Sequence, residues 1–72
     1  MELIFSSDST PDGGAIAYGH TYAHGVESGR YKLYFADGVI DRKAVQNGAR
    51  ITVGNNWISR LLDDNKLTLM EL

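Results

Sequence analysis

Two tyrosines and two histidines alternate along one short segment of this chain, as Tyr18, His20, Tyr22 and His24. Imidazole can bind a metal ion or transfer a proton near neutral pH, and histidines four residues apart share one face of a helix. Gly19 lies inside the segment and Gly25 follows it, which favours a strand. On a strand the two histidines would lie about 13 Å apart, too far for one ion, and a third ligand is missing. We therefore expect no metal and no cofactor here.

As a strand, residues 15–24 divide their side chains by size between two faces. The large face holds Ile16, Tyr18, His20, Tyr22 and His24, and the small face holds Ala15, Ala17, Gly19, Thr21 and Ala23. The rings of the large face have apolar bodies and polar tips, and tyrosine is enriched among residues that dominate protein interfaces. The small face allows another element to approach the backbone closely. We predict that Tyr18, His20, Tyr22 and His24 bind a partner, either another protein or a second copy in a homodimer. The alternative is that this aromatic face is ordinary core.

A second candidate surface lies on the strand Arg30–Phe35, where Arg30, Lys32 and Tyr34 point to one side. Aromatic side chains interleaved with basic ones suit stacking on single-stranded nucleic acid. Seven basic and nine acidic residues give a net charge of −2, however, which is too balanced for an electrostatic nucleic-acid binder. A nucleic acid is therefore the alternative partner and a protein the favoured one.

The usual patterns of catalysis are missing. The chain has no nucleophile elbow and no glycine-rich phosphate loop with lysine. The segment Asp8–Gly13 begins like a calcium-binding loop, but Gly19 stands where the bidentate glutamate is required. Asp63 and Asp64 are expected to be solvated. A chain of 72 residues is also short for enclosing a substrate pocket. We expect a protein that is not an enzyme.

Composition predicts one small soluble domain spanning residues 1–72. There is no cysteine, so disulfides and thiolate metal sites are excluded. The absence of cysteine fits a cytoplasmic protein, and we expect that localisation. Without a long apolar run, no membrane segment is expected. A compact, cysteine-free chain of this size is typical of phage and mobile-element proteins. One hypothesis is therefore an inhibitor of a host defence complex, of the anti-CRISPR kind.

Three strands are predicted in the first half of the chain, at residues 2–6, 15–24 and 30–35, with a turn over residues 25–29. Asp37-Gly38 is a strong two-residue hairpin signal, and it predicts a short return strand that sets Phe35 opposite Ile40. From Asp41 to Gly48 the chain can form one helical turn. The alternative is a second hairpin at Asn47-Gly48.

The C-terminal block reads as strand, helix and strand. Residues 50–53 are β-branched and short, either Asn55 or Asn56 can cap a helix, and Trp57, Ile58, Leu61 and Leu62 form one apolar stripe. Asn65 can end the helix in the left-handed conformation, and residues 66–71 alternate as a strand. A rival interpretation makes residues 57–62 a strand, which gives an all-β barrel. The run Gly29–Gly38 resembles hairpins of SH3 and Tudor barrels over ten residues and transfers no functional residue.

The predicted fold class is α+β: a small antiparallel sheet of four to five strands with one helix of the C-terminal half packed on a face. The SH3-like small barrel is the alternative. The predicted core consists of Leu3, Phe5, Ile16, Tyr31, Leu33, Phe35, Ile51, Val53, Trp57, Leu61, Leu67 and Leu69.

Overall fold

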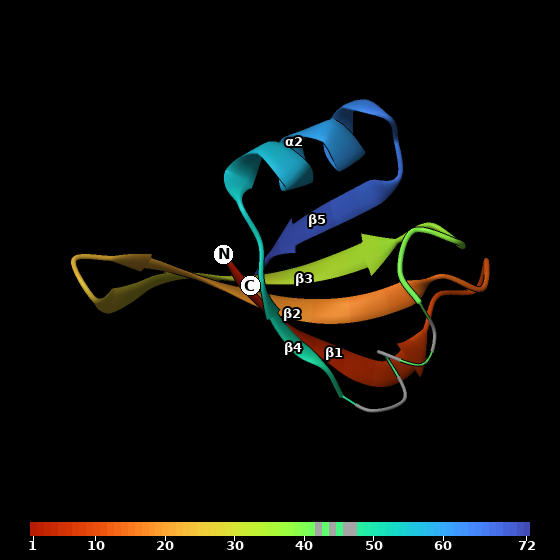
Figure 1. The fold of residues 1–72 in the computed structure, drawn as a ribbon, viewed down its shortest axis with the longest axis horizontal. Helices are drawn as coiled ribbons and strands as arrows, with labels where there is room; N and C mark the ends of the chain where they lie inside the picture. Colours follow the sequence, from red (N-terminus) through yellow and green to blue (C-terminus); the bar gives the residue numbers. More distant parts are fainter. Residues whose placement is uncertain (42, 44, 46–47) are drawn as a thin grey trace.

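The structure is a computed structural model that describes residues 1–41, 43, 45 and 48–72. Its strands form one antiparallel sheet in the order β4-β1-β2-β3-β5, with a helix, α2, in the C-terminal half (Figure 1). The elements are β1 (Glu2–Ser9), β2 (Ala15–Ala23), β3 (Val26–Phe35), β4 (Arg50–Thr52), α2 (Asn55–Asp63) and β5 (Leu67–Glu71). The sheet does not close into a barrel, so the α+β prediction is confirmed and the barrel alternative is wrong.

The helix α2 forms where the apolar stripe predicted it. Ile58 is buried, and Trp57 and Leu61 pack against the core, because their spacing places them on one face. The N-cap is Gly54 in an extended conformation, with no side-chain cap, so the proposed asparagine cap is wrong. Asn65 is left-handed at φ 56° as predicted. The backbone nitrogen of Lys66 then donates to the carbonyl oxygen of Leu61 at 2.8 Å, which turns the chain into β5.

The hairpin joining β2 to β3 is tighter than predicted: its turn consists of two residues and ends at Gly25, whereas the predicted turn ended at Gly29. Its two turn residues are His24 and Gly25, with φ of 53° and 77°, and Ala23 lies opposite Val26. Two positive φ values suit the tight turn that matches strand twist. Residues 26–29, assigned to the turn from the sequence, therefore belong to β3, and that part of the prediction is wrong. This hairpin extends past the other strands as an arm (Figure 1).

The turn at Asp37-Gly38 forms, but the predicted return strand does not follow within the described residues. The nitrogen of Val39 donates to the oxygen of Ala36 at 3.3 Å, and Gly38 has φ 82°. The neighbour of β3 is instead β5, which sets Phe35 opposite Leu67. The predicted pairing of Phe35 with Ile40 is therefore wrong, because β5 offers an apolar partner and a return strand would have opposed lysine to lysine.

The segment after this turn is described only in part. The nitrogen of Lys43 donates to Asp41 Oδ1 at 3.0 Å, as expected if Asp41 caps a helical turn. Gly48 has φ 63°, which suits the position after a helix. The rest of the predicted turn, residues 42, 44, 46 and 47, and the alternative hairpin at Asn47-Gly48 lie outside the described residues.

The core lies between α2 and one face of the sheet. Its buried residues are Leu3, Phe5, Ala15, Ala17, Leu33, Phe35, Val45, Ile58 and Leu67. The ring centroid of Phe35 lies 5.8 Å from that of Phe5 and 5.9 Å from that of Trp57. Of the other predicted members, Tyr31, Val53, Trp57, Leu61 and Leu69 are partly buried against this cluster.

Two residues predicted in the core lie elsewhere. Ile51 is 37% exposed because β4 is a three-residue edge strand. Ile16 is buried but lies on the other sheet face, opposite Tyr34. The small side chains of β2 face the core instead: a Cβ on Gly19 would stand 3.0 Å from the side chains of Leu3 and Leu33. The small face is therefore where neighbouring side chains approach the backbone, as predicted.

Candidate binding surface

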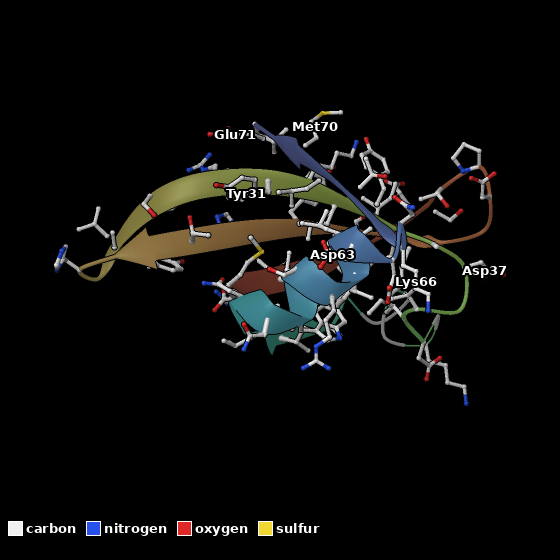
Figure 2. The ribbon with its side chains drawn as sticks, turned by 90° about the horizontal axis from the view of Figure 1, so that it is seen from above. Tyr31, Asp37, Asp63, Lys66, Met70 and Glu71 are labelled. Carbon is white, nitrogen blue, oxygen red and sulfur yellow. The ribbon has the colours of Figure 1, made fainter. Side chains whose placement is uncertain are left out.

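The sheet face turned away from α2 is here called the open face. Strand register and alternation define its residues: Glu2, Ile4, Ile16, Tyr18, His20, Arg30, Lys32, Tyr34, Arg50, Thr52, Thr68 and Met70. Figure 2 shows Met70 pointing away from α2, on the far side of β5. Met70 is 49% exposed, and most of the others are half-buried or exposed.

The register of β2 and β3 brings the two candidate sites from the sequence together. Tyr18 lies directly opposite Lys32, and His20 directly opposite Arg30. Tyr34, at the next position on the same face, lies opposite Ile16. Tyr18 and His20, from the residues predicted to bind a protein, therefore form one surface with the residues predicted to bind a nucleic acid.

Lys32 lies between two tyrosine rings on the open face. Its Nζ is 5.9 Å from the ring centroid of Tyr18 and 5.3 Å from that of Tyr34, within reach of a cation–π interaction. A hydrogen bond to Tyr34, with smaller electrostatic contributions from Tyr18 and Tyr34, raises the pKa of Lys32. The two rings therefore lie close to the ammonium group and favour its charged form.

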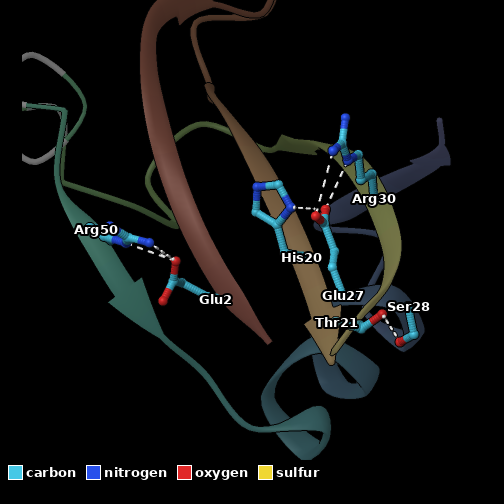
Figure 3. A network of polar contacts seen from close by, with 7 residues as sticks. All are labelled: Glu2, His20, Thr21, Glu27, Ser28, Arg30 and Arg50. Atoms are coloured by element: carbon cyan, nitrogen blue, oxygen red, sulfur yellow. Dashed lines mark hydrogen bonds and ion pairs between the residues drawn. The ribbon is translucent and has the colours of Figure 1, made fainter. Parts of the chain in front are cut away.

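The neighbouring basic residues of the open face are paired with carboxylates (Figure 3). Arg30 Nε donates to Glu27 Oε1 at 2.8 Å, and His20 Nδ1 lies 2.6 Å from the same oxygen. The hydrogen bond from Arg30, and then that with His20, lowers the pKa of Glu27. Arg50 Nε donates to Glu2 Oε1 at 2.7 Å.

Tyr22 and His24 lie on the projecting arm, Tyr22 still in β2 and opposite Glu27, and His24 in the turn. A bulge follows Thr21, and Tyr22 beyond it is 56% exposed. His24 is exposed in the left-handed turn position. The prediction that His24 continues the strand face is wrong because the strand ends at Ala23. A role of both residues in partner binding stays a prediction.

The polar side chains around His20 form two separate contacts. His20 and Glu27 make a histidine–carboxylate pair. In a nucleophilic catalytic site, the other ring nitrogen of such a histidine contacts a hydroxyl group. The hydroxyls of Thr21 and Ser28 are hydrogen-bonded to each other at 3.1 Å, apart from this pair (Figure 3). Within the described residues, no three potential metal ligands gather.

Several open-face residues were missed by the sequence reasoning. Glu2 and Ile4 alternate with the predicted core residues Leu3 and Phe5, so this alternation was a usable signal. Arg50 and Met70 carry the same signal, because they alternate with the predicted core residues Ile51 and Leu69.

Within the described part of the chain, no helix is long and apolar enough to cross a membrane. Comparison with models of protein families gave no match, and comparisons with curated proteins and with solved structures gave none either.

Proposed function

We propose that this chain is a non-catalytic binding module that holds a protein partner on its open face. The observation that carries the proposal is the arrangement of Tyr18, Lys32 and Tyr34, a cation between two rings on a sheet face opposite the helix. Tyrosine offers a wide apolar area and a hydroxyl at a low cost in rotamer entropy. Rings already held by a neighbouring cation lose even less freedom on binding.

Apolar side chains surround this arrangement. Ile4 and Met70 lie in the same cross-strand row as Tyr18 and Lys32. An interface with apolar and aromatic residues at its centre and charged pairs at its rim is the usual anatomy of protein complexes. The ion pairs of Arg30 and Arg50 are well placed to form that rim.

A nucleic acid is the second candidate partner, because Arg30, Lys32 and Tyr34 share the open face with Tyr18 and His20. Stacking and phosphate contacts together suit single strands. The logarithm of the binding constant for a nucleic acid falls linearly with the logarithm of salt concentration, because binding releases counterions. A steep salt dependence of binding to an oligothymidylate would favour this candidate.

The test compares capture by the wild-type chain, Tyr34→Ala and a helix-face control, Leu62→Ala. Leu62 is 38% exposed on α2, so the control removes an accessible apolar side chain elsewhere. Each immobilised protein is incubated with bacterial lysate, and bound proteins are quantified by mass spectrometry after the melting temperature of each variant has been checked. We expect Tyr34→Ala to reduce the binding free energy of a specific partner by about 1–3 kcal/mol, the range of a modest interface hot spot. Equal losses in both variants would contradict the proposal.

The finer hypothesis from the sequence, an inhibitor of a host defence complex, stays a prediction. A cell-based interference assay with wild-type protein and Tyr34→Ala tests it. Sedimentation of the purified chain tests the other possibility, a second copy as the partner, because a homodimer would depend on concentration.

A further inference from the structure

The charge of the open face differs in sign from that of the remaining chain. The face carries Arg30, Lys32 and Arg50, and the two carboxylates bonded to its arginines are Glu2 and Glu27. The other residues of the chain comprise four basic and seven acidic side chains. The face therefore has an excess of one positive charge on a chain of net charge −2.

This excess is located at Lys32. Both arginines are neutralised by a carboxylate of the same surface, Arg30 by Glu27 and Arg50 by Glu2. Within the part of the chain that the structure describes, the ion pairs involve these arginines and His20, and none involves Lys32. The near neighbours of its ammonium group are Tyr18 and Tyr34.

We propose that the partner places an aspartate or glutamate carboxylate on Lys32, between Tyr18 and Tyr34. The inference rests on the proposed function and specifies the chemistry of the partner: an acidic side chain with apolar neighbours, on a protein. An ammonium–carboxylate hydrogen bond is stronger than a neutral one. Tyrosine hydroxyls beside the ammonium can donate to the same carboxylate.

Lys32 is the one basic residue of the open face without an ion pair in the described part of the chain, and this favours a protein over a nucleic acid. Nucleic-acid binders gain most of their affinity by neutralising several phosphates. Here Arg30 and Arg50 would each have to leave a carboxylate to contact a phosphate. One carboxylate from a protein satisfies Lys32 without disturbing either pair, and Ile4 and Met70 remain available for its apolar neighbours.

A displayed library of random twelve-residue peptides is the probe. Peptides selected on the wild-type chain are measured against Lys32→Met, Lys32→Arg and the charge-loss control Arg60→Met, which lies on α2. We expect the enriched peptides to share an aspartate or glutamate. Both Lys32→Met and replacement of that residue by its amide should weaken binding about tenfold, with no further loss when the two are combined. Lys32→Arg and Arg60→Met should bind within about threefold of the wild type, since each keeps on the open face a cation that can interact with both rings.

The outcomes separate this inference from the proposed function. Peptides that depend on Tyr34 but carry no acidic residue, or that bind Lys32→Met equally well, would overturn the carboxylate and leave the open face as the binding site. Tighter, strongly salt-dependent binding of oligothymidylate through Lys32 would overturn it in favour of phosphate. A selection that yields no binder sensitive to Tyr34→Ala would count against both.

Discussion

Gly14 occupies a position where the structure leaves no room for a side chain. It is buried just before β2, and its nitrogen donates to Thr10 Oγ1 at 2.7 Å. A Cβ there would overlap the carbonyl oxygen of Phe35 and stand 2.9 Å from its carbonyl carbon and 3.0 Å from that of Ala36. These are backbone atoms at the end of β3, where the nitrogen of Ala36 donates a hydrogen bond to the carbonyl oxygen of Lys66 at 2.9 Å. Gly14→Ala must therefore displace the last pairing between β3 and β5.

The expected cost follows from these contacts. Overpacking a filled site costs about 1–3 kcal/mol, and loss of a ladder hydrogen bond adds about 1 kcal/mol. A chain of this length is stable by only about 4–11 kcal/mol. Gly14→Ala should thus lower the melting temperature by about 8 °C or more, at about 4–8 °C for each kcal/mol.

Thermal unfolding followed by circular dichroism measures this change. The matched control is Gly54→Ala, where no heavy atom lies within 4 Å of the new Cβ and φ is −80°. The control should stay within about 1 kcal/mol of the wild type, since only a helix cap changes. If Gly14→Ala melts within a few degrees of the control, the close approach of Gly14 to Phe35 is refuted.

Three further predictions concern single side chains. Trp57→Ala should cost about 3 kcal/mol in urea unfolding, at the low end for an aromatic truncation because the ring is only partly buried; an unchanged midpoint would remove Trp57 from the core. Tyr22→Ala should leave the melting temperature within a few degrees, since Tyr22 is 56% exposed, and unfolding would show that it packs. The pKa of Glu27 is lowered by Arg30 first and His20 second, so its stabilising contribution is present above its usual pKa near 4.5 and is lost as the pH falls through the folded-state value. Titration of the Glu27 carboxyl by NMR should give a midpoint below 4.5 that rises in Arg30→Met, and a midpoint at or above 4.5 would contradict the network.

Patterns within one element predicted structure well. The stripe of Trp57, Ile58, Leu61 and Leu62 was sufficient to indicate α2, although Leu62 is 38% exposed and does not join the core. Alternation divided β2 into its two faces. Which face of β2 is buried was not readable from β2 itself, because Leu3 and Leu33 of the neighbouring strands fill the space above Gly19.

Features that depend on competition between distant segments were predicted poorly. The pair His24-Gly25 is a weak turn signal compared with Asn-Gly or Asp-Gly, so the turn was placed too late and the register of β2 and β3 stayed open. Asp37-Gly38 gave the stronger signal, yet β5 took the edge of β3 instead. The candidate residues Tyr18 and Lys32 were each identified from their own strand, and only the register shows that they face each other.

The position of β1 between β2 and β4 has a consequence for the order of folding. Glu2 lies opposite Thr52, and Met1 and Val53 exchange backbone hydrogen bonds, each 2.8 Å long, across 52 residues. Closing such a long loop costs entropy before its contacts form, which slows folding. During synthesis β1, β2 and β3 emerge first, so the edge of β1 stays unpaired until Arg50–Thr52 has left the ribosome. The strand β1 carries the apolar residues Leu3 and Phe5, and an unpaired apolar edge strand is a template for aggregation. The nascent chain is therefore most prone to aggregation in the interval between the synthesis of β3 and that of β4.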